Sequence, residues 1–446
     1  MDKKKEFVHS FIIGFALFSV FFGAGNLIFP PAIGVASGTK WMPAIAGLTF
    51  SAIILPILTV IAIGHMDGRM EKLCRPVAPW FSGVYLIFFI LFAGCLGVPR
   101  QGGTAIETGL FGLFPQFGGS KIALFIGLLI YFGLVFYLVF NPSKIVERVG
   151  KILTPFLLII LVGIVIVSIV KPIGTPGDTG ITNAFTNSLL TGYQTGDVVV
   201  GIVVAAMFVS SIKDYGYKDK KSMDRITLKA AVVAFFGLLI VYGGLLYLGA
   251  TGMDYFSADT DQTALLIGLV KMLVGNVGSG ALSVAVFLAC LTTSTGIISS
   301  IATMTQTLTK GKIKYQYMVI FGCSVGILIG TIGVSSIIKI SFPTFFLLYP
   351  VAIILTLLGV FEKYVPNHGS WKGATLMAAL IGIYDMLKAL SDMGVNIHLG
   401  FLENLYGMLP LANYGMAWIF PSIVGFIVGT VIIKAKGLES YPMFKE

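Results

Sequence analysis

Charged residues are scarce in this chain. Only 11% of its 446 residues are Asp, Glu, Lys or Arg, whereas a soluble domain carries about 25%. No long linker divides the chain, and its longest polar stretches, residues 213–226 and 251–264, read as ordinary loops. This composition excludes a soluble globular protein and predicts a single transmembrane domain covering residues 1–446.

Cysteine is rare as well, and the motifs of several protein classes are missing. The four cysteines, Cys74, Cys95, Cys290 and Cys323, have no metal-site spacing, so we expect neither zinc nor disulfides. The sequence contains no HExxH motif, no paired catalytic aspartates and no Ser–His set at membrane depth, which argues against an enzyme and against an organic cofactor. A channel is disfavoured because no ring-forming filter repeat is present.

Long apolar runs fill the chain instead. Hydrophobic residues make up 56% of it, and the mean hydropathy is +0.93. Many runs are long enough to cross about 30 Å of hydrocarbon as helices. We therefore predict an all-α polytopic membrane protein with about twelve spans, at residues 7–36, 42–65, 81–114, 121–141, 149–171, 184–212, 227–250, 278–307, 315–334, 337–361, 371–391 and 413–434.

The net charge of +10 is explained by topology. If the N-terminus is cytoplasmic, 23 of the 30 Lys and Arg residues fall at cytoplasmic ends of spans, among them Lys144, Arg148, Lys151 and Lys445. This bias predicts a multi-pass protein of the plasma membrane with both termini in the cytoplasm. Anionic lipid is the expected partner of these charges, whereas neither nucleic acid nor an obligate protein partner is implied.

Two spans are interrupted at corresponding positions. The first contains "FFGAGNLIFPP", residues 21–31, in which glycines weaken the helix and Pro30 and Pro31 each remove an amide donor. The sixth contains "LLTGYQTGDVV". Paired interruptions of this kind are typical of transporters built from inverted repeats. We predict a first repeat at 1–175, a second at 176–362, and two peripheral helices at 363–446.

A broken helix exposes backbone dipoles at membrane depth, which is tolerated only where they line a cavity. Amide groups at the start of the second half-helix suit a carboxylate; these belong to Gly23, Ala24 and Gly25. Freed carbonyls around Ser19 and Phe22, together with the Asn26 side chain, suit a small hard cation.

Span eight carries a run of hydroxyl groups in "LACLTTSTG", residues 288–296. Adjacent threonine hydroxyls and a nearby carbonyl form the kind of oxygen cluster that sodium prefers. The alternative is that each hydroxyl donates to the preceding turn of its own helix, as Ser and Thr in membrane helices often do.

These motifs, with the loop "SIKDYGYKDKK", resemble the BrnQ family of branched-chain amino acid:cation symporters over essentially the whole chain. More distantly, G-x-G-N-x-x-F-P in span one and A-x-L-T-[ST]-S in span eight resemble the LeuT-type transporters. The resemblance implies a LeuT-type fold of five plus five helices. It also implies Asn26 as a ligand of one sodium ion. The ligands it implies for a second sodium are Ser19, Phe22, Ala289, Thr292 and Thr293.

Span six departs from the LeuT-type pattern because "TGYQTGD" includes an acid. The substrate-binding candidates here are Thr191, Tyr193, Gln194 and Thr195. Asp197 is costly in lipid and could hold a cation, a proton or the substrate ammonium. It could instead pair with a basic side chain such as Arg100.

Span three contains "GCLGVPRQGGTAIETG". Arg100 and Glu107 are seven positions apart, which places them on one face of a regular helix. We expect an ion pair or an extracellular gate there. In span eleven, Asp385 and Lys388 are expected to form a local pair.

Together these observations predict a secondary active transporter that imports leucine, isoleucine and valine with sodium by alternating access. The substrate's main chain would meet the GAGN break, and its side chain would lie among apolar residues of spans three, six and eight. The alternative is proton coupling through Asp197 or Glu107.

Overall fold

The structure is a computed structural model that describes residues 3–140 and 154–438, and every regular element in these ranges is helical. Four of the charges used in the topology prediction, Lys144, Arg148, Lys151 and Lys445, lie outside the described residues, as does the start of the predicted span 149–171. Seven described helices are long and apolar enough to cross a membrane, or eight with one bent pair, and three apolar helices are shorter. The number twelve therefore stays a prediction.

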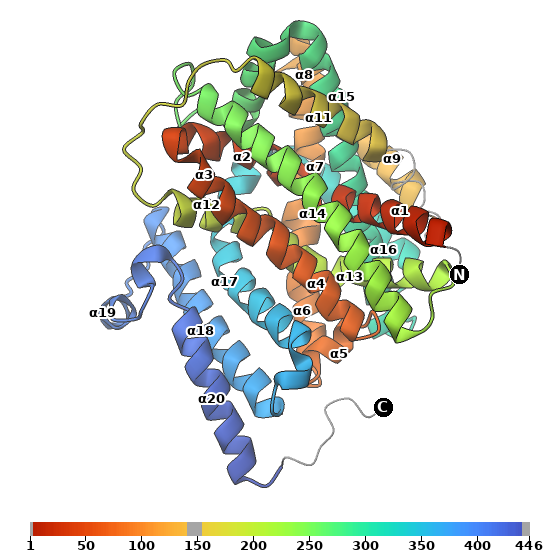
Figure 1. Cartoon of the computed structure of the whole chain (residues 1–446), viewed down its shortest axis with the longest axis vertical. Coiled ribbons are helices and arrows are strands. Elements are labelled where there is room, and N and C mark those ends of the chain that lie inside the picture. The colour runs from red at the N-terminus through yellow and green to blue at the C-terminus, as the bar shows by residue number, and fades with distance from the viewer. Residues whose placement is uncertain (1–2, 141–153, 439–446) are drawn as a thin grey trace.

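The helices follow one another along the chain as shown in Figure 1. Their bounds are α1 Lys3–Phe21, α2 Ala24–Ser37, α3 Trp41–Thr49, α4 Leu55–His65, α5 Met70–Cys74, α6 Phe81–Phe89, α7 Val98–Thr104, α8 Phe111–Leu113, α9 Lys121–Val139, α11 Thr154–Val170, α12 Ala184–Tyr193, α13 Asp197–Asp214, α14 Lys220–Thr251, α15 Gln262–Leu308, α16 Tyr315–Gly330, α17 Val334–Val360, α18 His368–Asp392, α19 Phe401–Gly407 and α20 Ile419–Ala435. Gly275, at φ +65°, kinks α15.

The first break lies between α1 and α2. Gly23 is extended, with φ −108° and ψ −166°, so the helical path stops at Phe21 and resumes at Ala24. Pro30 and Pro31 lie inside α2, contrary to the expectation that they contribute to the break. Their effect is different. Proline has no amide hydrogen, so the carbonyls of Asn26 and Leu27, four residues earlier, lack their usual hydrogen-bond donor within the helix.

The second break separates α12 from α13. The two helices meet at 48° across residues 194–196. Gly196 has φ +79°, a left-handed conformation that favours glycine, and it turns the chain so that α13 begins at Asp197. The carboxylate of Asp197 therefore lies in the first turn of α13, where a helix favours negative charge.

The third span is continuous from Phe81 to Leu113 but contains two π-helical segments. They are Ile90–Gly97 and Ala105–Leu110, and they flank α7 on both sides. A π segment widens the turn and so changes which residues share a face, and such segments occur often at functional sites.

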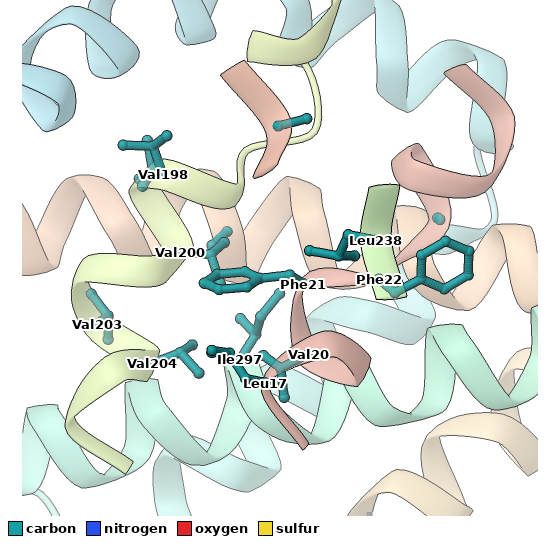
Figure 2. Close-up of a cluster of buried hydrophobic side chains, with 14 of the residues drawn as sticks. Leu17, Val20, Phe21, Phe22, Val198, Val200, Val203, Val204, Leu238 and Ile297 are labelled. Carbon is teal, nitrogen blue, oxygen red and sulfur yellow. The ribbon is translucent and has the colours of Figure 1, made fainter. Parts of the chain in front are cut away.

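The two halves of the broken first span pack against long neighbours. Helix α14 runs along both α1 and α2. At Gly34 and Gly249 the two backbones approach so closely that a Cβ on either glycine would collide with main-chain atoms of the other helix. Helix α15 also contacts α1, α2, α7 and α13, so the break is enclosed by the helices that carry the other candidate motifs. Figure 2 shows the apolar cluster there, with Phe21 close to Val200 and Ile297.

The C-terminal helices form a separate layer. Helix α18 packs on both α17 and α20, and the blue helices stand at one edge of the molecule in Figure 1. The predicted pair of Asp385 with Lys388 is wrong, because Lys388 lies 3.3 Å from Asp392, one turn further on, and 3.9 Å from Glu403.

Candidate functional site

A small cavity lies where the two breaks face each other. Its volume is about 20 Å³, enough for about one water molecule. The walls come from α1, α2, the third span, α13, α15 and α17; the polar lining residues are Asn26, Arg100, Gln101, Thr195, Asp197, Thr293 and Ser341, and the apolar side chains are Val20, Phe92, Ala93, Leu96, Val200, Ile297 and Phe345. Apolar residues of spans three, six and eight thus meet polar groups at both breaks.

Two threonines of α15 face the end of α1. Thr293 Oγ1 lies 3.4 Å from the Ser19 carbonyl, 3.2 Å from that of Val20 and 3.4 Å from that of Phe22. Thr292 Oγ1 lies 3.2 Å from the Ser19 carbonyl and 2.9 Å from that of Ala289. The structure thus brings together the hydroxyl and carbonyl groups that the resemblance assigned to one sodium ion.

The next two hydroxyls of the run point elsewhere. Ser294 Oγ is 2.8 Å from the hydroxyl of Tyr131 on α9, and Thr295 Oγ1 donates to the Thr292 carbonyl at 2.7 Å. The hydroxyl of Ser19 is buried and has no hydrogen-bond partner. Only half of the threonine-serine run therefore faces the break, together with an unpaired oxygen of α1.

Asn26 connects the two breaks directly. Its Nδ2 donates to Asp197 Oδ2 at 2.6 Å and to the hydroxyl of Tyr242 on α14. Asn26 and Asp197 are 2% and 5% exposed, so this carboxylate is held by hydrogen bonds rather than by water. Asn26 therefore lies beside the carboxylate of Asp197, a neighbour that was not expected when Asn26 was assigned as a sodium ligand.

Arg100 binds the end of α12. Its Nη1 donates to the Gln194 carbonyl at 3.0 Å and its Nη2 to the Thr195 carbonyl at 3.4 Å. A cation at the C-terminal end of a helix is favoured by the helix dipole. The guanidinium is 5% exposed, and its Nε has no partner, so one donor of a buried cation remains available beside the cavity.

The expected pairing of Arg100 with Glu107 is not made. Glu107 Oε1 instead accepts a hydrogen bond from the Val334 amide at the start of α17, at 3.2 Å. The physical reason is the π segment Ala105–Leu110, which shifts the register so that positions seven apart no longer share a face. Glu107 lines a second, larger cavity of about 860 Å³ together with Asp261 and Lys271.

The substrate-binding candidates are only partly gathered at the cavity. Gly23 and Thr195 line it. The Thr191 hydroxyl donates to the Asn187 carbonyl of its own helix, and the Tyr193 ring stacks on Tyr349 at 4.4 Å. The backbone carbonyl of Gln194 accepts a hydrogen bond from Arg100.

The amide groups of the first break have a partner that was not predicted. The Ala24 amide donates to Gln101 Oε1 at 2.7 Å. A Cβ on Gly23 would meet the Gln101 amide group, and a Cβ on Gly25 would lie 2.9 Å from the Phe29 ring and 3.3 Å from Arg100 Nη2. The glycines thus make room for span-three side chains at the start of α2.

Sequence reasoning missed Gln101, Tyr242 and Phe345. Gln101 stands next to Arg100 in the quoted motif, but only the contacts in the folded chain reveal that both side chains reach the breaks. Tyr242 is one of two tyrosines in the apolar part of α14, and Phe345 lines the cavity and packs edge-on against Phe92, with ring centroids 4.4 Å apart. Neither leaves a periodic signal in the sequence.

The sequence is similar to known transport proteins over nearly its full length. It is 33% identical over 430 residues to branched-chain amino acid permease BraB of Bacillus subtilis, covering 94% of each chain. It is 31% identical to permease BrnQ of the same organism, covering 97% of this chain and 98% of that one.

Two solved structures share the fold at low sequence identity. The nucleobase-cation-symport-1 family transporter MHP1 with bromovinylhydantoin bound matches with a TM-score of 0.60 and 15% identity, over 98% of this chain and 94% of that chain. MhsT in complex with L-phenylalanine matches with a TM-score of 0.59 and 16% identity, over 96% and 98%. The predicted LeuT-type fold is confirmed by these neighbours. The family profile described as "Branched-chain amino acid transport protein" matches residues 6–436, and the chain belongs to that family.

Proposed function

We propose that this protein imports leucine, isoleucine and valine by sodium symport, with alternating access around the breaks α1/α2 and α12/α13. The observation that carries the proposal is the convergence of Thr292 and Thr293 on the carbonyls of Ser19 and Phe22, at 3.2–3.4 Å, beside a cavity lined by both apolar and polar side chains. Relatives over the whole length of the chain are named branched-chain amino acid permeases, which supports the substrate class.

The residues present fit a sodium ion as cargo. The cluster supplies backbone carbonyl and hydroxyl oxygens without a formal charge, and the buried Ser19 hydroxyl adds an oxygen that has no protein partner. A monovalent hard cation needs oxygen ligands, and an all-neutral set keeps the site from holding a divalent ion tightly. The Ala289 carbonyl accepts a hydrogen bond from the Thr292 hydroxyl at 2.9 Å within α15, so it lies beside the same group of oxygens.

The cavity lining combines two kinds of group that suit a neutral amino acid. The start of α2, Arg100 and Asp197 offer amide donors, a cation and an anion to the two charges of a zwitterion. Leu96, Val200 and Ile297 offer apolar surface to an aliphatic side chain. At about 20 Å³ the cavity is too small for the substrate, so binding requires the walls to separate.

A second candidate is proton coupling through Asp197. The observation that favours it is a carboxylate that is 5% exposed and bound to Asn26 at 2.6 Å, deep in the membrane domain. Acidic side chains within membrane spans often act as proton relays. Glu107 is less suited, because it lines the other cavity.

The topology belongs to the same proposal. Both termini face the cytoplasm, the repeats comprise residues 1–175 and 176–362, and residues 363–446 are peripheral. The last assignment is supported by the packing of α18 on α17 and of α20 on α18.

The deciding experiment is uptake of labelled leucine into proteoliposomes that contain the purified protein. An inward sodium gradient at equal pH should drive accumulation, and a proton gradient without sodium should not. Protein-free liposomes are the control. Accumulation that follows pH and ignores sodium would replace sodium with proton coupling, and no leucine uptake under either gradient would contradict the transport proposal.

A further inference from the structure

The carboxamide of Gln101 occupies the place where an anion would bind the broken helix. Its Oε1 lies 2.7 Å from the amide nitrogen of Ala24, the first residue of α2. Amide groups in the first turn of a helix have no acceptor within the helix and carry the positive end of its dipole, so an incoming carboxylate is their natural partner. Gln101 is 4% exposed and lines the cavity with Gly23.

We propose that Gln101 is a built-in substitute for the substrate carboxylate: it holds the Ala24 amide in the substrate-free protein and leaves when the amino acid binds. This inference rests on the proposed function and adds to it a residue that sets affinity. It assigns to the third span a role in recognition that the GAGN motif alone does not reveal.

The exchange is favourable for chemical reasons. A carboxylate accepts a hydrogen bond more strongly than a neutral carboxamide does, since the charged acceptor also interacts with the helix dipole. An amino acid can therefore displace Gln101, whereas an amine or an alcohol with the same side chain cannot. Room for the glutamine exists because residue 23 is glycine; a Cβ there would lie 2.6 Å from Gln101 Nε2.

The contact between Gln101 and Ala24 also assists the conformational change that the transporter makes without substrate. After release, the empty binding site must become accessible from the outside again, and an unpaired amide buried at the break during that change would be costly. Gln101 removes that cost by accepting from Ala24. It thus weakens substrate binding and facilitates the empty return by the same contact.

The test is Gln101→Met, which keeps length and apolar volume but removes the acceptor. Leucine binding to purified protein at saturating sodium, measured by scintillation proximity, should tighten roughly two- to tenfold, the worth of one buried neutral hydrogen bond. In proteoliposomes, net uptake should slow while leucine–leucine exchange, which needs no empty return, is retained.

Thr104→Val is the matched control, because Thr104 lies one turn further along α7, is fully buried and has an unpaired hydroxyl. It should change neither leucine affinity nor the ratio of net uptake to exchange. Unchanged or weaker leucine binding by Gln101→Met would overturn the inference. If the wild-type protein binds no leucine at all, the proposed function fails, and the two failures are therefore distinguishable.

A second variant tests the same contact from the opposite direction. Gln101→Glu places a permanent carboxylate on the Ala24 amide, so leucine affinity should fall at least tenfold. 3-Methylbutylamine, which has leucine's side chain and ammonium but no carboxylate, should now compete better than it does on the wild-type protein. Leucine binding that survives this change, or an amine that gains nothing, contradicts the assignment.

Discussion

At the scale of single residues, the hydroxyl run of α15 divides into two functions. Thr293 contacts three carbonyls of the α1 end, while Thr295 only returns a hydrogen bond to its own helix. Neighbouring side chains in a helix point about 100° apart, so four hydroxyls in succession cannot all face one ligand. The sequence located the oxygen cluster, but which hydroxyls serve it depends on the rotation of α15 about its axis.

Thr293→Val should therefore impair sodium dependence specifically. Valine keeps the shape and removes the oxygen, so the sodium concentration for half-maximal uptake should rise about tenfold, which corresponds to about 1.4 kcal/mol. The leucine concentration for half-maximal uptake, measured at saturating sodium, should change much less. Thr295→Val is the control and should leave both nearly unchanged. An unaltered sodium dependence in well-folded Thr293→Val would remove this residue from the ion site.

Gly25→Ala should abolish leucine uptake, but for a reason that the sequence alone did not provide. The added methyl group would press on the Phe29 ring and on Arg100 Nη2, and so disturb the guanidinium that holds the end of α12. Gly14, in the unbroken part of α1, looks harmless in the sequence, yet a Cβ there would lie 2.7 Å from Val233. The proper control is Gly133→Ala on α9, where a Cβ meets nothing within 4 Å. Normal uptake by Gly25→Ala would refute this account.

At the scale of helices, the sequence predicted where the chain breaks better than how its faces point. Both breaks lie within the quoted motifs, because glycine next to polar residues is costly in a membrane helix unless it serves a cavity. The π segments of the third span were not predictable, since the wider turn has no composition of its own. Without them, the sequence places Arg100 and Glu107 on one helical face.

The N-terminal half-helix is attached to α14 by an ion pair. Glu6 Oε1 lies 2.7 Å from Lys229 Nζ and 3.1 Å from Arg225 Nε. The hydrogen bond from Lys229 holds the pKa of Glu6 below its usual range. A depressed pKa means that the contact is present above the unfolded-state pKa of about 4.3 and is lost only as the pH falls through the folded-state value. Uptake between pH 5 and 8 should not vary through this group.

Glu6→Gln should loosen α1 at neutral pH. Amide hydrogen exchange in the first turns of α1 should accelerate, because the charge that attracts Lys229 and Arg225 is gone. Asp67→Asn, which breaks a comparable but local and exposed pair with Lys72, should leave α1 unaffected. Equal exchange in wild-type protein and Glu6→Gln would show that packing alone holds α1.

The peripheral helices meet through glycines. Gly369 and Gly373 of α18 lie against the backbone of Gly429 and Gly425 of α20, so a Cβ on any of them would collide with main-chain atoms. Small residues spaced four apart permit this close approach of membrane helices. Gly373→Leu should lower stability by about 1–3 kcal/mol, seen as a reduced melting temperature in detergent, with leucine half-saturation in proteoliposomes unchanged. A changed half-saturation would connect this layer to the transport site.

At the scale of the whole molecule, the coupling proposal has an electrical consequence. One sodium ion that enters down about 100 mV gains about 2.3 kcal/mol, and a tenfold sodium gradient adds about 1.4 kcal/mol. With one ion per neutral substrate, these terms sustain roughly 500-fold accumulation of leucine. Uptake should therefore carry inward current, measurable with proteoliposomes on a solid-supported membrane. Electroneutral uptake would require a different ion balance.

The overall architecture was the part best predicted. Hydropathy, the two interruptions and the oxygen-rich segment were sufficient for the fold because lipid leaves a membrane chain few alternatives to packed helices. Contacts between distant segments, such as Asn26 with Asp197 and Tyr242, were not predictable, since they depend on how the helices are rotated against one another.

The small volume of the cavity finally has a kinetic consequence. At about 20 Å³, the cavity that Phe92 and Phe345 help to line is too small to admit leucine directly. Some opening fluctuation must come first, so at high leucine concentration the observed association rate should level off at the frequency of that opening, well below the diffusional ceiling. The maximal rate of substrate binding is then set by the opening rate of the protein. The leucine concentration decides only which fraction of the openings leads to binding.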